Sequence, residues 1–91
     1  MQHVPGSKVA DIKFYGLSTC PWCKKAKTLL DSLGVEYEFE YVDLLTGSKR
    51  DATMAEVSKW NSSRSFPTIV IDNSKCIVGF KEQEIRDALK K

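Results

Sequence analysis

Apolar residues recur along this chain with two different periods. In residues 21–33 they stand at positions 22, 26, 29, 30 and 33, which is the spacing of one face of a helix. In residues 35–42 they alternate with glutamates, which predicts a strand with one apolar and one charged face. Divided in this way, the chain has elements in the order β-α-β-α-β-β-α: 12–15, 21–33, 35–42, 48–60, 68–71, 75–78 and 81–90.

This order predicts an α/β fold with a mixed sheet. Strands and helices that alternate imply a parallel strand pair with a right-handed crossover, and a closing hairpin adds antiparallel strands. Like charges along one face of 35–42 discourage pairing with another chain, which favours an edge strand. Residues 1–10 show no period and are expected to be a flexible lead-in, so that residues 11–91 form one domain.

Composition and charge exclude several classes of protein. The chain has 91 residues and a net charge of +2, from 14 basic and 12 acidic side chains. This balance does not favour nucleic acid or a membrane surface as a partner. No apolar run approaches the roughly 20 residues that span a bilayer, and no signal-peptide pattern is present. We therefore expect a cytoplasmic monomer, in a compartment where structural disulfides are rare.

The candidate chemistry lies in Cys20-Pro21-Trp22-Cys23, where a strand gives way to a helix. Pro21 suits the first helical position, where no backbone N–H is needed. At the preceding cap position Cys20 faces unpaired N–H groups, which stabilise a thiolate. Cys20 is thus predicted to attack a disulfide and Cys23 to resolve the mixed disulfide. Trp22 belongs to the helical stripe but also stands between the thiols, so burial and exposure are both open.

The alternative for a Cys-x-x-Cys pair is half of a zinc site. Such a site normally has four ligands, and here only Cys76 and His3 remain, without a ligand pattern. We therefore predict no metal and no bound cofactor, and expect Cys76 to be a core residue. Downstream, a cis bond between Phe66 and Pro67 would aim the Phe66 backbone toward the thiols, where an extended substrate can pair with it.

The chain resembles the glutaredoxin family, the small branch of the thioredoxin fold, over about residues 11–90. The motifs that carry the resemblance are Tyr15, Cys20-Pro21-Trp22-Cys23, Phe66-Pro67-Thr68 and Gly79-Phe80. The resemblance implies a thioredoxin-like fold of the glutaredoxin type, with a four-stranded sheet flanked by three helices. It also implies a cis bond before Pro67, with Cys20 as nucleophile and Cys23 as resolving thiol.

The chain departs from the family where glutathione is held. Glutaredoxins often have two glycines and two acidic residues after the last strand. In this chain Gly79 is followed by Phe80, and Glu82 is the one acidic residue that remains at these positions. Arg64 and Lys24 remain as candidates for contact with the glutathione carboxylates. The Gly79-Phe80 step is more similar to redoxins that serve ribonucleotide reductase and are reduced by thioredoxin reductase.

The resemblance therefore leaves the electron donor open between glutathione and thioredoxin reductase, and implies disulfide-containing proteins, such as ribonucleotide reductase, as substrates. A carrier of an iron–sulfur cluster is the alternative function, because some relatives hold a cluster through the first cysteine and glutathione. The altered glycine motif and the second cysteine both argue against a carrier.

Overall fold

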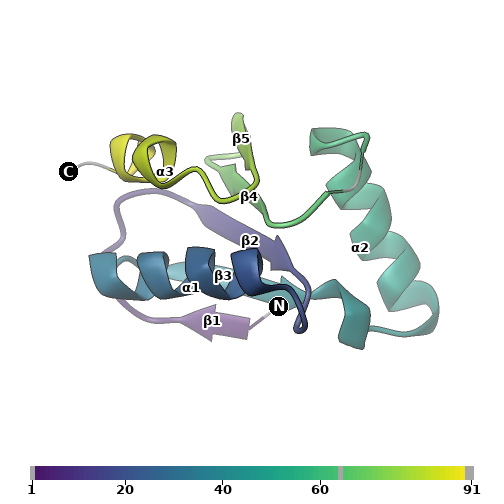
Figure 1. The fold of residues 1–91 in the computed structure, drawn as a ribbon. Coiled ribbons are helices and arrows are strands. Elements are labelled where there is room, and N and C mark those ends of the chain that lie inside the picture. The colour runs from purple at the N-terminus through teal and green to yellow at the C-terminus, as the bar shows by residue number, and fades with distance from the viewer. Residues whose placement is uncertain (1, 64, 90–91) are drawn as a thin grey trace.

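The computed structural model describes residues 2–63 and 65–89, which form one mixed sheet with helices on both faces (Figure 1). The strands lie in the order β1-β3-β2-β4-β5, with β2 and β3 parallel and the other pairs antiparallel. From residue 12 onward the predicted α/β class and element order are confirmed. The elements are β1 (Gln2–Val4), β2 (Ile12–Gly16), α1 (Pro21–Leu33), β3 (Tyr37–Tyr41), the 3-10 turn η1 (Val42–Leu44), α2 (Gly47–Trp60), β4 (Thr68–Ile71), β5 (Lys75–Val78) and α3 (Glu82–Ala88).

The sheet has five strands rather than the predicted four, because part of the expected lead-in 1–10 joins it. Gln2–Val4 pairs antiparallel with β3, and Ser7 donates its backbone N–H to the Gly34 carbonyl at 2.8 Å. Gly6 permits this approach, since a Cβ there would lie 2.7 Å from the same carbonyl oxygen. The prediction that 35–42 is an edge strand is therefore wrong: β3 is an inner strand, and it is shorter than predicted.

Two apolar clusters cover the two faces of the sheet. The larger cluster joins Phe14 and Ile69 of the sheet to Leu30 of α1 and Ile85 of α3. The smaller one contains Tyr15, Val42 and Val70 with Val57 of α2. Figure 1 shows α2 beyond the ends of β2 and β3, on the side where α1 begins. The C-terminal ends of the parallel strands β2 and β3 therefore lie on the side where α1 begins, which is where ligands commonly bind in α/β sheets.

The helices match the predicted ranges closely. α1 spans 21–33 as predicted and ends at Gly34, whose φ of 67° is the left-handed conformation typical of a helix end. α2 starts one residue earlier than predicted, and α3 ends at Ala88, while position 90 of the prediction lies outside the described residues. Every helix in the described part of the chain is too short or too polar to cross a membrane.

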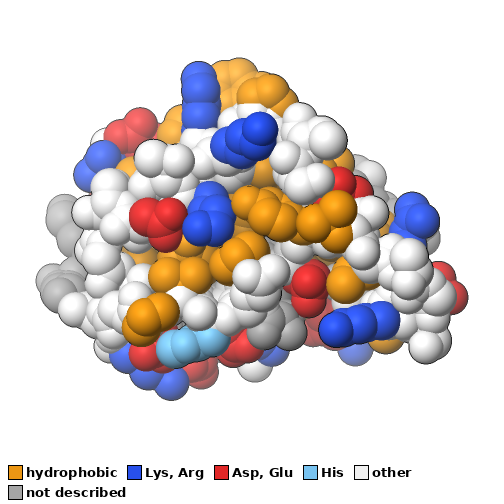
Figure 2. All heavy atoms as spheres, turned by 90° about the horizontal axis from the view of Figure 1, so that it is seen from below, with side chains coloured by type: hydrophobic (Ala, Val, Ile, Leu, Met, Phe, Trp, Pro, Cys, Tyr) orange, Lys and Arg blue, Asp and Glu red, His pale blue; other side chains and the backbone are white. Residues whose placement is uncertain are grey.

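Aromatic rings continue along β3 on the face that α1 covers. Phe39 lies 6.2 Å from Tyr37 and 5.4 Å from Tyr41, measured between ring centroids. The Lys27 ammonium of α1 lies 4.8 Å from the centre of the Phe39 ring and bonds Asp31 at 3.3 Å. Seen from below, on the side of β1, hydrophobic side chains gather in the middle of the surface among basic and acidic ones (Figure 2). The contact of Lys27 with Phe39 joins α1 to β3.

Candidate active site

Cys20 occupies the cap position of α1. Its backbone is extended, with φ −89° and ψ 117°, and Pro21 follows as the first helical residue. The Cys20 carbonyl accepts the Lys24 N–H at 3.1 Å, so the helical hydrogen bonds begin at this residue. The Cys20 sulfur in turn accepts the Cys23 backbone N–H at 3.3 Å. A side chain that caps a helix in this way receives the N–H groups that the helix itself leaves unpaired.

Cys23 lies one turn further along and is fully buried. Its sulfur accepts the backbone N–H of Leu17 at 3.4 Å. The loop that contains Leu17 is fixed by Asp43, whose carboxylate accepts the Ser18 N–H at 2.9 Å and the Ser18 hydroxyl at 2.5 Å. Both sulfurs are thus held by backbone hydrogen bonds, one partly exposed and the other inside the protein.

The two thiols have opposite electrostatic environments. Desolvation disfavours the Cys20 thiolate, but hydrogen bonds from the Cys23 side chain and from the Cys23 and Trp22 backbone outweigh it and lower the pKa of Cys20. Burial, followed by the interaction with Cys20, raises the pKa of Cys23 to about 12. Burial also raises the pKa of Cys76. Of the three thiols, Cys20 is therefore the one that ionises most readily, and its sulfur is partly exposed.

Alkylation should distinguish the three thiols. With iodoacetamide, the reduced protein is expected to react first at Cys20, with a half-maximal rate at lower pH than for the urea-unfolded chain. A lowered pKa shifts the thiolate population toward acid, and only the thiolate reacts. Peptide mass mapping across pH 5–10 measures the profile of each cysteine. A Cys20 profile that coincides with that of the unfolded chain would contradict the geometry described for the cap.

Pro67 follows a cis bond from Phe66, as the resemblance implies, and it directly precedes Thr68, which pairs with Tyr15 near the end of β2. The Pro67 carbonyl accepts the Gly79 N–H at 2.8 Å, which ties the start of β4 to the end of β5. The hydroxyl of the next residue, the fully buried Thr68, donates to the Ser65 carbonyl at 2.7 Å. The backbone around Phe66 is thereby held at the edge of the site.

Trp22 is 55% exposed, which settles the question that its place in the helical stripe left open. Its ring stacks on Phe80, with centroids 6.0 Å apart and an interplanar angle of 27°. Together with the half-buried Phe66 and Gly79, these rings line a groove of about 290 Å³. Four of the predicted site residues thus line one groove, and one of them, Trp22, belongs to the Cys20–Cys23 motif itself. Arg64, another predicted site residue, lies outside the described residues.

Sequence reasoning missed the side chains that position this site. Asn61 is buried, donates to the Ser65 carbonyl at 2.9 Å and accepts the Ser63 hydroxyl at 2.6 Å, which orders the loop before Phe66. Asp43 does the same for the loop before Cys20. Asparagine, serine and aspartate are typical of any turn, so their pattern indicates a loop but not which atoms they hold.

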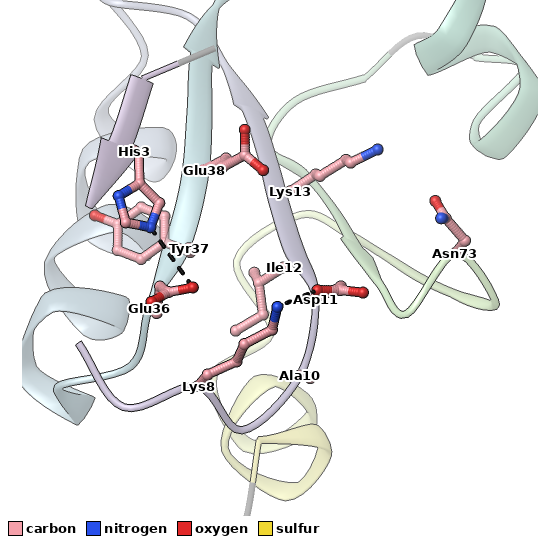
Figure 3. Close-up of a pocket in the computed structure, with 10 residues that line it drawn as sticks. All are labelled: His3, Lys8, Ala10, Asp11, Ile12, Lys13, Glu36, Tyr37, Glu38 and Asn73. Atoms are coloured by element: carbon pink, nitrogen blue, oxygen red, sulfur yellow. Dashed lines mark ion pairs between the residues drawn. The ribbon is translucent and has the colours of Figure 1, made fainter. Parts of the chain in front are cut away.

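A second, polar pocket lies at the opposite end of the sheet (Figure 3). It has a volume of about 260 Å³ and lies where β2 and β3 begin, whereas the thiols follow the end of β2. Several of its polar side chains are paired, since His3 lies 3.5 Å from Glu36 and Lys8 lies 3.2 Å from Asp11. Within 2–63 and 65–89, no group of three or more His, Cys, Asp and Glu side chains could hold a metal ion.

Comparison with known proteins gives one consistent result. The family model for glutaredoxin matches residues 12–77. A glutaredoxin of known structure from Methanosarcina mazei is 49% identical, with a TM-score of 0.92 over 99% of this chain and 87% of that one. The methanoredoxin of Methanosarcina acetivorans is 49% identical, with a TM-score of 0.91 over 94% of this chain and 90% of that one. A glutaredoxin-like 8.6 kDa protein from the rubredoxin operon of Clostridium pasteurianum is 38% identical over 88% of this chain and 99% of its own length.

Proposed function

Because this chain belongs to the glutaredoxin family, and with it to the thiol–disulfide oxidoreductases, we propose that it reduces protein disulfides with the dithiol of Cys20 and Cys23. The observation that carries the proposal is the opposite environment of the two sulfurs. Hydrogen bonds lower the pKa of Cys20 against its desolvation at a partly exposed helix cap, while burial raises that of Cys23 to about 12. An attacking thiol needs to be ionised and reachable, and a resolving thiol does not.

The reaction proceeds in two exchanges. The Cys20 thiolate attacks one sulfur of a substrate disulfide, the substrate S–S bond breaks, and the released thiolate takes a proton. The mixed disulfide removes the negative charge from Cys20. Cys23 then loses its proton and attacks the Cys20 sulfur, which releases the second substrate thiol and leaves a Cys20–Cys23 disulfide. Two electrons have passed to the substrate, and an external reductant must restore the dithiol.

Backbone and rings around Cys20 would hold the substrate. The Phe66 backbone, which precedes the cis bond, is placed to pair with an extended substrate chain. Trp22 and Phe80 offer apolar contact beside it. Phe80 stands where glutaredoxins often have a second glycine that helps to hold glutathione, and its bulky ring stacks on Trp22 in the groove. This substitution favours thioredoxin reductase over glutathione as the electron donor.

Two coupled assays separate the donors. The oxidised protein is supplied with NADPH and either thioredoxin reductase or glutathione with glutathione reductase, and insulin reduction is followed by turbidity. We expect faster turnover with thioredoxin reductase, because the Phe80 ring obstructs glutathione. Equal or faster turnover with glutathione would contradict the assignment of the donor, and no insulin reduction in either assay would contradict the proposed function itself.

A further inference from the structure

Two grooves meet at the ring of Phe80. One is the 290 Å³ groove at the thiol end, between Trp22, Phe66 and Phe80. The other has a volume of about 380 Å³ and runs between α1 and α3, with Phe80 again in its wall. Figure 1 shows α1 and α3 on the same side of the sheet. The two grooves therefore adjoin at Phe80, and together they mark a path from Trp22 along α1.

The second groove combines an apolar lining with a basic rim. Leu29 and Phe80 contribute apolar surface, and Lys24 and Lys25 line one side. Both lysines are exposed, and neither forms an ion pair with a carboxylate of the described residues. The Lys25 ammonium lies 4.6 Å from the centre of the Trp22 ring, at the junction with the thiol groove.

The opposite side of this groove adds little net charge. Arg86 lines it from α3, but its guanidinium bonds the Glu82 carboxylate at 2.9 Å. The unpaired positive charge of the rim thus comes from the two lysines of α1. A ligand that fits this groove needs apolar side chains for its lining and negative charge beside Lys24 and Lys25.

The length of the path indicates the size of the ligand. From Trp22 to Ser32, the last residue of α1 that lines the groove, the helix rises about 15 Å at 1.5 Å per residue. An extended chain covers that distance with about five residues at 3.3 Å each. A small disulfide would occupy only the thiol end of the path, whereas a polypeptide segment can follow it throughout.

We infer that the substrate of the proposed dithiol reaction is a protein disulfide flanked by an extended, apolar and acidic segment, which lies in the groove between α1 and α3. An apolar side chain next to the reacting cysteine contacts Trp22 and Phe80. Carboxylates further along the segment pair with Lys24 and Lys25. Pairing of this kind selects among substrates by charge and accelerates encounter, even where each exposed pair is weak. This inference rests on the proposed function.

Synthetic peptides test the charge preference. Each peptide carries one cysteine as a disulfide with 2-mercaptoethanol, followed by a leucine and, three and four positions from the cysteine, either two glutamates or two lysines. The reduced protein is expected to reduce the glutamate peptide about three- to ten-fold faster than the lysine peptide at low salt. Equal rates for the two peptides would overturn the inference.

Charge reversal locates the effect. In the variant Lys24→Glu/Lys25→Glu, the lysine peptide should become the faster substrate. The matched control Lys49→Glu/Lys75→Glu changes the net charge equally at exposed positions of α2 and β5 that line neither groove, and it should keep the original preference. The same change of preference in both variants would assign the effect to overall charge and would contradict binding of the segment in the groove.

Two small disulfides complete the test. The rate of reduction of oxidised glutathione is compared between the wild-type protein and Lys24→Glu/Lys25→Glu. If this rate falls as much as the rate for the glutamate peptide, the lysines bind a small anionic disulfide, and the inference of an extended segment is wrong. Bis(2-hydroxyethyl) disulfide, which is small and uncharged, reports the chemistry alone. If the wild-type protein reduces it but treats the peptides alike, only this inference fails, whereas no reduction at all means that the proposed function fails.

Discussion

Replacing Cys20 by serine is expected to abolish disulfide reduction, with a fall of at least ~1,000-fold in the rate of insulin reduction. A serine hydroxyl is not ionised near neutral pH and forms no mixed disulfide. Serine is also a preferred helix cap, and its hydroxyl can accept the Cys23 N–H that the Cys20 sulfur accepts now. The helix start should therefore survive the change, and the loss of activity should reflect chemistry rather than folding.

A serine at Cys76 is the matched control. Cys76 lies half-buried in β5, and burial raises its pKa. Cys76→Ser is expected to reduce insulin at close to the wild-type rate, with a small change in its urea midpoint. If Cys20→Ser kept normal activity while Cys76→Ser lost it, the nucleophile would have been assigned to the wrong thiol.

Replacing Cys23 by serine should stop the reaction at the mixed disulfide between Cys20 and the substrate. Cys20 can still attack, but no internal thiol resolves the mixed disulfide, and an external thiol lacks the advantage of proximity. We expect insulin turnover to fall about 100-fold or more and the substrate to remain attached to the protein. Because Cys23 is fully buried, circular dichroism and a urea titration are needed to show that the variant is folded. Normal turnover without an attached substrate would contradict a resolving role.

The helix that carries the thiols was predictable, because its signal is local. The spacing of Ala26, Leu29 and Leu30 is enough to choose the buried face, and Gly34 marks the end. The place of Cys20 at the cap follows from Pro21 alone. Such features depend on residues close together in sequence, and the structure confirms them.

Features that depend on distant partners were not predictable. Gln2–Val4 joins the sheet through backbone hydrogen bonds to β3, and three residues before Pro5 and Gly6 carry no periodic signal of a strand. The stack of Trp22 on Phe80 joins two helix starts that are far apart in sequence. Only the folded chain brings such residues together, and these contacts shape the surface around the dithiol.

Mapping the attached substrate in Cys23→Ser tests most directly which cysteine attacks the substrate and which resolves the mixed disulfide. The variant is mixed with a peptide disulfide, quenched with acid and digested, and the modified cysteine is identified by mass spectrometry. The substrate is predicted to be attached to Cys20, with Cys76 unmodified. Attachment to Cys76, or no attached substrate while the peptide is still reduced, would contradict Cys20 as the attacking thiol and Cys23 as the resolving one.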